Sequence, residues 1–272
     1  MLKIRDLFIY PVKSLGGIRV DSARLTDRGL QHDRRWMLVD DTNRFLSQRE
    51  FAQMALLRPG VTDNGLLISN KNSKDSFLIP FLPQTNETLP VTIWDDQVTA
   101  QLVSPEADLW FSKQLNISCK LVYMPDATLR KVDREYAYDD EVTSFSDAYP
   151  LMMIGQASLD DLNSRLDQPL PMNRFRPNVV FDGGLPYEED EMEHFRIGAV
   201  DFFGVKLCAR CNIPTIDQDT LEKSKEPSRT LSQYRQRNNK IYFGQNVLYH
   251  GEAEIKVGDE IEVVERKASP FA

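Results

Sequence analysis

The sequence is poor in cysteine and histidine and has no long hydrophobic run. Its 272 residues include 3 cysteines and 3 histidines, and so few thiols, in an odd number, do not make the disulfide framework of a small secreted domain. No segment approaches the roughly 18 consecutive apolar residues of a transmembrane helix. The first residues lack the apolar core and cleavage site of a signal peptide. We therefore expect a soluble, cytoplasmic protein with no membrane partner.

Basic residues are fewer than acidic ones. The chain has 33 Lys and Arg against 41 Asp and Glu, a net charge of -8, which disfavours nucleic acid as a partner. The sequence also lacks the G-x-S-x-G of hydrolases, the Walker P-loop spacing and the dinucleotide-binding G-x-G-x-x-G. Basic residues that cluster against this acidic background therefore indicate a small anionic ligand.

Short runs of alternating apolar and polar residues dominate the chain, a pattern typical of half-buried strands. They occupy residues 2–10, 35–40, 91–102 (as a hairpin), 119–124, 200–207 and 260–264. Helical patterns are fewer and cover residues 104–115, 158–166 and 231–237, with Ser158 as the expected N-cap of the second. The polar stretch 125–146 is expected to be a loop or a change of domain. A mainly β fold with some helices, of the α+β class, follows.

Two of the cysteines, Cys208 and Cys211, form a C-x-x-C pair. A redox pair should open a helix, and Pro214 argues against that. A zinc site needs about four ligands, and the other Cys and His residues are scattered. On the residues alone, two half-buried thiols that pack like small apolar side chains are the simplest interpretation. Arg210 between them favours a thiolate, the form that binds metals.

Three basic stretches are candidates for the anion site. Lys13 and Ser14 lie between an expected strand and a glycine pair, where a turn can present backbone N–H groups, a cation and a hydroxyl to one anion. Arg34 directly precedes a strand. Arg174 and Arg176 are two positions apart, so in an extended segment they face the same way. Taken singly, each stretch is more simply a solvated surface segment.

An acidic run, Glu188 to Glu193, contains five carboxylates in six residues. Its simplest interpretation is a solvated loop. The alternative is a docking site for a positively charged partner.

A series of short motifs extends over nearly the whole chain. They are IYPVKS (9–14), DRRW (33–36), FLSQRE (45–50), SFSDAYP (144–150), SLDDLN (158–163), FRPN (175–178), CARC (208–211), EPSRTLSQYR (226–235), FGQN (243–246) and IKVGDEIEV (255–263). In this order they resemble the MOSC-domain proteins with an N-terminal MOSC-type β-barrel region, such as the bacterial YcbX-like proteins and the mitochondrial amidoxime-reducing component. The resemblance implies two interlocked parts, residues 1–120 and a MOSC β-barrel of residues 121–272, with the site between them.

The resemblance also implies a molybdenum cofactor, a molybdopterin that bears a phosphate. Cys211 is implied as the thiolate ligand of the metal and as the catalytic residue, which suits a metal already bound by sulfur. The residues implied to line the cofactor site are Lys13, Ser14, Arg34, Asp147, Arg176, Asn178 and Gln245.

The implied activity is the reduction of small N-hydroxylated compounds. The three cysteines are too few for the four-thiolate cluster of a ferredoxin domain, which some YcbX-like proteins have. We therefore expect electrons from a separate flavin, haem or iron–sulfur protein. Because MOSC domains also resemble a domain of molybdenum-cofactor sulfurases, the alternative is a sulfur carrier that holds a persulfide on Cys211. A third hypothesis is a cofactor-binding protein without turnover.

Overall fold

A closed seven-stranded β-barrel forms the larger part of the fold. The computed structural model describes residues 1–271. The hydrogen-bonded order around the barrel is β12 (Leu151–Gly155), β13 (Val179–Asp182), β1 (Leu2–Ile9), β19 (Glu260–Arg266), β14 (Met192–Ile197), β15 (Val200–Ala209) and β17 (Lys240–His250), and β17 returns to β12. β2 (Ile18–Val20) and β16 (Gln236–Arg237) extend it by pairing with β1 and β17. The mainly β prediction with a few helices is confirmed.

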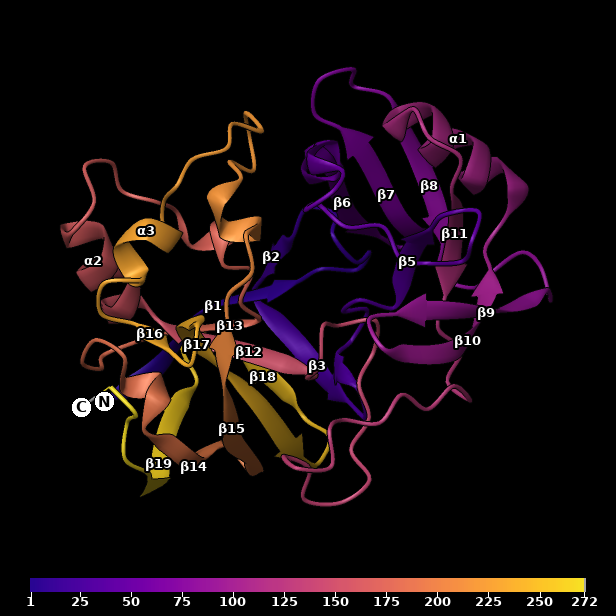
Figure 1. Cartoon of the computed structure of the whole chain (residues 1–272). Helices are drawn as coiled ribbons and strands as arrows, with labels where there is room; N and C mark the ends of the chain where they lie inside the picture. Colours follow the sequence, from indigo (N-terminus) through magenta and orange to yellow (C-terminus); the bar gives the residue numbers. More distant parts are fainter. Residues whose placement is uncertain (272) are drawn as a thin grey trace.

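The first strand of the chain belongs to the barrel built mostly from the second half. β1 pairs antiparallel with β13, with Lys3 opposite Asp182, and with β19. Figure 1 shows β1 beside β12 and β13, while the strands β5 to β11 lie on the other side of the molecule. The expected division at residue 120 falls where β11 begins, and β11 pairs with strands of the first half. A division of the sequence at that point stays a prediction.

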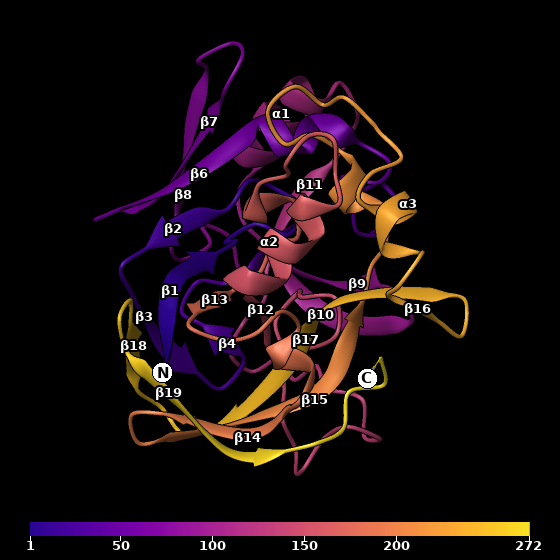
Figure 2. The same ribbon diagram turned by 90° about the vertical axis from the view of Figure 1, so that its left-hand side faces the viewer.

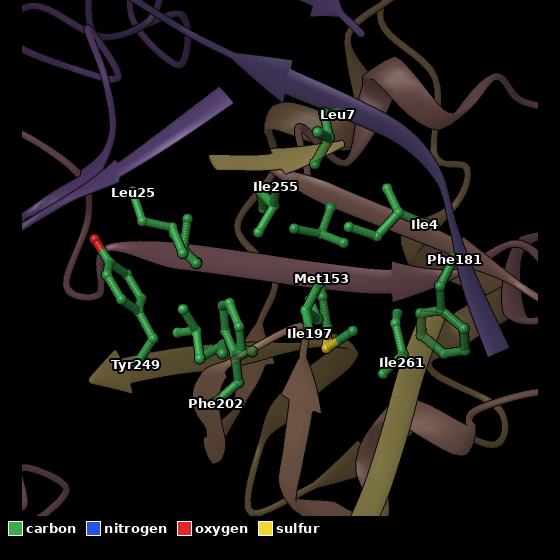
Figure 3. Packing of buried hydrophobic residues seen from close by; sticks show 14 of the residues in the cluster. Ile4, Leu7, Leu25, Met153, Phe181, Ile197, Phe202, Tyr249, Ile255 and Ile261 are labelled. Atoms are coloured by element: carbon green, nitrogen blue, oxygen red, sulfur yellow. The ribbon is translucent and has the colours of Figure 1, made fainter. Parts of the chain in front are cut away.

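The barrel interior is apolar because its strands alternate inward and outward side chains. In β1, Leu2, Ile4, Leu7 and Ile9 are buried. Figure 3 shows Ile4 and Leu7 among side chains from β12, β13, β14 and β15. These contacts fix the beginning of the chain against the barrel, which leads the segment after β1 towards the other part of the molecule.

The other part contains a four-stranded sheet with the order β5 (Trp36–Val39), β11 (Lys120–Tyr123), β10 (Asp96–Leu102) and β9 (Thr88–Ile93). All four residues of β5 are buried, and they alternate between two cores. Trp36 and Leu38 join one core, and Met37 and Val39 join the other. A strand covered on both faces gives a continuous apolar run, which is the pattern WMLV of residues 36–39.

Two small sheets and one long helix complete the architecture. The sheets are β18 (Glu254–Lys256), β3 (Ser22–Thr26) and β4 (Gly29–Leu30), and β6 (Leu57–Thr62), β7 (Gly65–Asn70) and β8 (Ser76–Pro80). The helix α1 (Pro105–Leu115) is as predicted, because Ser104 Oγ accepts a hydrogen bond from the N–H of Ala107 and Pro105 opens the first turn. Its buried face includes Phe111, which packs into the core that contains Trp36.

Two helix predictions need correction. α2 (Gln156–Ser164) begins before Ser158, so Ser158 is inside the helix rather than its N-cap. The third helix, α3, covers Ser228–Leu231 instead of residues 231–237, because residues 236–237 pair with β17 as β16. Figure 2 shows α2 next to β12 and β13. None of the helices within residues 1–271 has the length and apolar character required to cross a membrane.

The acidic run of residues 188–193 is not the solvated loop that the sequence suggests. Glu189 and Asp190 are fully buried in a short 3-10 helix (Glu188–Asp190). Ser158 Oγ donates a hydrogen bond to Glu189 Oε2 at 2.7 Å, and Arg235 forms an ion pair with Asp190 at 2.6 Å. The burial of Ser158 against Glu189 also explains why it does not cap α2. A docking role for this run is therefore not supported, because its central carboxylates face inward.

Glu189 is expected to make stability depend on pH. Burial and the nearby charge of Asp190 raise the pKa of Glu189 to about 7. A carboxyl whose pKa is higher in the folded state than in the unfolded state stabilises the fold fully below its unfolded pKa. For Glu189 this contribution is about 3 kcal/mol, and it is lost as pH rises through about 7. In Glu189→Gln, the free energy of unfolding should fall much less between pH 5 and pH 8 than it does in wild type. Urea unfolding at both pH values measures the difference, and an unchanged pH slope would contradict the assignment.

Candidate functional site

One cavity, lined by residues from both parts of the molecule, holds most of the predicted site residues. Its empty space, counted together with the open solvent at its mouth, is about 740 Å³. The predicted residues in its lining are Lys13, Ser14, Arg34, Asp147, Arg176, Asn178 and Cys211. The cavity lies where the segment after β1, the loop before β12 and the end of β15 meet.

Three of these residues have backbone conformations that non-glycine residues rarely adopt. The φ angles of Ser14, Arg34 and Arg176 are 67°, 50° and 57°, all in the left-handed region. Each such residue costs of the order of 1 kcal/mol or more, and such strain is concentrated at functional sites. Here the strained backbone turns three polar side chains towards one cavity.

Lys13 is a buried cation with two oxygen partners. Its Nζ donates to the carbonyl of Phe145 at 2.9 Å and to Asp147 Oδ1 at 2.6 Å. Burial lowers the pKa of Lys13 to about 8, although the charge of Asp147 opposes the shift. Partial desolvation acts against ionisation of Asp147, but Lys13 outweighs it and keeps the pKa of this carboxyl below its ordinary range. At neutral pH both groups are therefore charged.

The guanidinium groups of Arg34 and Arg176 both lie over the ring of Tyr10. Their central carbon atoms are 4.5 and 4.3 Å from the ring centroid. Arg34 is further fixed by Asp33 at 2.5 Å and donates to Asn178 Oδ1 at 3.1 Å. These contacts leave little rotational freedom, so the two cations are pre-oriented for a ligand.

Arg176 has no carboxylate partner within residues 1–271. Its Nη1 donates to the carbonyl oxygen of Leu15 at 2.7 Å. Burial lowers the pKa of Arg176 to about 10, so the group stays charged at neutral pH. A charged, desolvated guanidinium that lacks a protein anion is a suitable partner for an anionic ligand.

The cysteine pair is reduced, and its two members differ in environment. Cys211 is exposed and Cys208 is half-buried. Arg210 Nη1 donates to Cys208 Sγ at 3.0 Å, but burial outweighs this contact and raises the pKa of Cys208. Within residues 1–271 no three Cys, His, Asp or Glu side chains form a metal-binding group. Cys211 is thus the thiol that a metal with other ligands of its own could reach.

The lining of the cavity is strongly positive although the chain is acidic overall. Its five cations are Lys13, Arg34, Arg49, Arg176 and Arg210, and its one carboxylate is Asp147. Among residues 1–271, the last three arginines have no acidic group within 4 Å. Arg210 Nε is also buried without a hydrogen-bond partner. The donor set therefore fits a ligand that carries negative charge.

Gln245 is the predicted site residue that the structure places elsewhere. On β17, Asn246 faces Met152 across the sheet, and both line the cavity. Gln245 faces Met153, whose side chain belongs to the barrel core. Neighbouring strand residues point to opposite faces, so Gln245 lies inside the barrel, against Gly204. We predicted a cofactor contact at Gln245, whereas Asn246 occupies the cavity wall.

Sequence reasoning missed six residues of the lining that bear polar side chains: Ser47, Arg49, Ser146, Tyr149, Arg210 and Asn246. Arg49, Asn246 and Tyr149 lie inside motifs that the sequence analysis quoted, but none was assigned to the site. Arg210 was considered only for its effect on the thiols. Arg49 could have been identified from the motif FLSQRE of residues 45–50, which is one of those that carry the resemblance. Arg49 follows Ser47 by two positions in that motif.

The chain is similar to known families and proteins over most of its length. Residues 1–118 match the MOSC N-terminal beta barrel domain, and residues 140–262 match the MOSC domain. The chain is 32% identical to mitochondrial amidoxime-reducing component 1 of Mus musculus, over 95% of this chain and 81% of that protein. It is 30% identical to the protein of that name from Homo sapiens, with 95% and 82% covered.

A second kind of relative is much longer. The chain is 30% identical to the molybdenum cofactor sulfurase of Oryza sativa subsp. japonica, over 96% of this chain but only 35% of that protein. The similarity to the amidoxime-reducing components extends over most of both chains. From these matches, the chain belongs to the family of MOSC-domain proteins that have an N-terminal MOSC β-barrel domain.

Proposed function

We propose that the protein is a molybdenum-cofactor-dependent oxidoreductase that reduces small N-hydroxylated compounds. The observation that supports this most directly is the cavity in which Cys211 lies among five cations, three of them without carboxylate partners within residues 1–271. The relatives that match over most of their length have names that describe amidoxime reduction. A cavity of this charge fits the phosphate of a molybdopterin, and an exposed thiol fits a soft metal.

The residues proposed to hold the cofactor divide by chemistry. Lys13, Arg34 and Arg176 would bind its phosphate and other polar atoms, and Cys211 would provide a thiolate to the metal. Ser14, Asp147 and Asn178 would contribute hydrogen bonds. When bound, a molybdenum cofactor supplies oxygen-atom transfer coupled to two electrons. The strained backbone at Ser14, Arg34 and Arg176 is consistent with residues selected for position rather than for stability.

The reaction itself is a two-electron reduction. An amidoxime takes up two electrons and two protons, its N–O bond breaks, and the products are an amidine and water. We propose that a separate flavin, haem or iron–sulfur protein supplies the electrons. Cys119 is buried in the core of the first half, away from the pair at Cys208 and Cys211, so the described thiols do not converge on a four-thiolate cluster.

The test is a measurement of metal, pterin and activity on one preparation. Protein purified from a host that makes molybdopterin should contain molybdenum and pterin near one equivalent. With reduced methyl viologen as electron donor it should convert benzamidoxime to benzamidine. Protein that contains metal and pterin but lacks turnover would favour the cofactor-binding hypothesis. Protein that contains neither would contradict the proposal.

Lys13 should make cofactor retention depend on pH. Because burial lowers the pKa of Lys13 to about 8, its charge is lost in the folded protein as pH rises through that value. Loss of this cation weakens the attraction for a phosphate, so release of pterin should be several-fold faster at pH 9.5 than at pH 7. Pterin fluorescence in the filtrate measures the release rate.

The matched control is Lys13→Arg, which keeps the charge over the same pH range because a guanidinium does not deprotonate there. Its release rate should vary little between pH 7 and pH 9.5. If wild type shows no more pH dependence than this variant, Lys13 does not bind the anionic part of the cofactor.

A further inference from the structure

One cation of the cavity, Arg49, is not among the residues proposed to hold the cofactor. Arg49 Nε donates to Ser47 Oγ at 3.0 Å, and its two terminal amino groups make no hydrogen bond within residues 1–271. The guanidinium lies 4.1 Å from the centroid of the Trp94 ring. A stacked guanidinium keeps its N–H edges free, in the fork geometry that binds a carboxylate or phosphate.

Trp94 occupies a position where tryptophan is unfavourable. It lies in the turn between β9 and β10 with a φ of 56°, a conformation that favours Asn or Gly. The residue is 42% exposed. Its Nε1 donates to Asp147 Oδ1 at 3.3 Å, and its ring lies 5.1 Å from that of Phe45, a cavity residue. Trp94 thus contacts three residues of the cavity lining, Arg49, Asp147 and Phe45.

Charge pairing separates Arg49 from two of the cations proposed for the cofactor, Lys13 and Arg34. Lys13 is only 5% exposed and is held by two oxygen atoms, and the Arg34 side chain is 14% exposed and paired with Asp33. Arg49 instead stacks on the exposed Trp94 and has no acidic partner within residues 1–271.

We propose that Arg49 is a substrate-recognition residue and that Trp94 positions it. On this proposal, which rests on the proposed reductase function, the preferred substrates are N-hydroxylated compounds that carry an anionic group, carboxylate or phosphate, at a distance from the N–O bond. The anionic group binds the free edge of Arg49 while the N-hydroxylated group extends towards Cys211. As in the reduction of any amidoxime, two electrons and two protons are taken up, the N–O bond breaks, and an amidine and water are formed.

The test compares substrates that differ only in charge. These are benzamidoxime, 4-carboxybenzamidoxime and 4-phosphonobenzamidoxime, with reduced methyl viologen as donor. In wild type, KM should be at least about tenfold lower for one or both anionic compounds, and the lower of the two identifies carboxylate or phosphate as the natural group. Arg49→Gln should abolish this preference, so that KM for the anionic compounds rises to about the value for benzamidoxime.

Two further variants separate recognition from structure. Trp94→Asn suits the left-handed turn, so the fold should be as stable as wild type or more stable, while KM for the anionic compounds rises. Arg44→Gln is the matched control, because Arg44 is also near Phe45 but is exposed, paired with Glu50 and outside the cavity. It should leave all three KM values unchanged.

Binding can be followed without turnover by the fluorescence of Trp94. Titration with 4-carboxybenzamidine should quench tryptophan emission in wild type, and the quenching should be lost in Trp94→Phe and weakened at least about tenfold in Arg49→Gln. If wild type reduces none of the three substrates yet binds this compound through Arg49, the reductase function fails and the anion site stands. Equal KM values for charged and neutral substrates in wild type, or loss of pterin in Arg49→Gln, would overturn the proposal.

Discussion

Replacing Cys211 by alanine is expected to lower the rate of benzamidoxime reduction by more than about 100-fold. Loss of residues that merely orient a metal ligand costs 10- to 100-fold, and loss of the ligand itself should cost more. Because the Cys211 side chain is exposed, the fold should be unaffected, and the urea midpoint of the variant should equal that of wild type. Initial rates per molybdenum, with metal content measured on the same sample, separate lost chemistry from lost metal.

Cys208→Ala is the matched control, because the two thiols are three positions apart but differ in exposure. Cys208 is half-buried and accepts a hydrogen bond from Arg210, and burial raises its pKa, so it remains a thiol. Its removal should change the rate by less than about tenfold.

The sulfur-carrier hypothesis predicts a different result for the same pair of variants. Wild type would then contain no molybdenum or pterin, and mass spectrometry would detect a persulfide on Cys211 that is absent from Cys211→Ala. A fully active Cys211→Ala enzyme would contradict both hypotheses. The excess of cations around Cys211 favours the cofactor, because a persulfide carrier needs no phosphate-binding wall.

Replacing Arg235 by methionine is expected to destabilise the fold by about 3–5 kcal/mol, because it leaves a buried carboxylate without its cation. Asp190 and the Arg235 side chain are 0% and 2% exposed, and they are 2.6 Å apart. Arg235 also lies over the rings of Tyr187 and Phe271, so methionine retains part of the packing and loses the charge. The free energy of unfolding in urea measures the effect.

The destabilisation should depend on pH. Burial already raises the pKa of Asp190, against the opposing charge of Arg235, and removing this cation raises it further. A carboxyl whose folded-state pKa is raised adds stability below its unfolded pKa and loses it as pH rises through the folded pKa. Arg235→Met should therefore be closer to wild type at pH 5 than at pH 8.

Arg266→Met is the surface counterpart. Arg266 pairs with Glu188 and Glu191 in the same acidic run, but its side chain is 47% exposed. An exposed ion pair contributes at most about 1 kcal/mol, so this variant should lose less than that. If Arg235→Met and Arg266→Met lowered the free energy of unfolding equally, burial of Asp190 would not determine the cost of losing its cation.

Local patterns predicted much of the secondary structure. The alternation in residues 2–10 gave β1, and Ser104 followed by Pro105 gave α1, because both depend on side chains within a few positions. The hairpin expected within residues 91–102 is present, with Trp94–Asp95 as its turn, since Ile93 pairs with Asp96. Ser158 was misassigned as a cap because its hydrogen-bond partner, Glu189, is 31 residues away.

The sequence by itself determined which side chains have the required chemistry: the thiol of Cys211 and the cations Lys13, Arg34 and Arg176. Only the tertiary structure decided which charges are neutralised. Lys13 pairs with Asp147, 134 residues away, while Asp190 is buried because Arg235 reaches it. Arg44 and Arg49 look alike in the sequence, but Glu50 pairs with one and leaves the other free at the cavity. Side-chain chemistry is a local property, whereas desolvation and pairing of charge depend on contacts between distant segments.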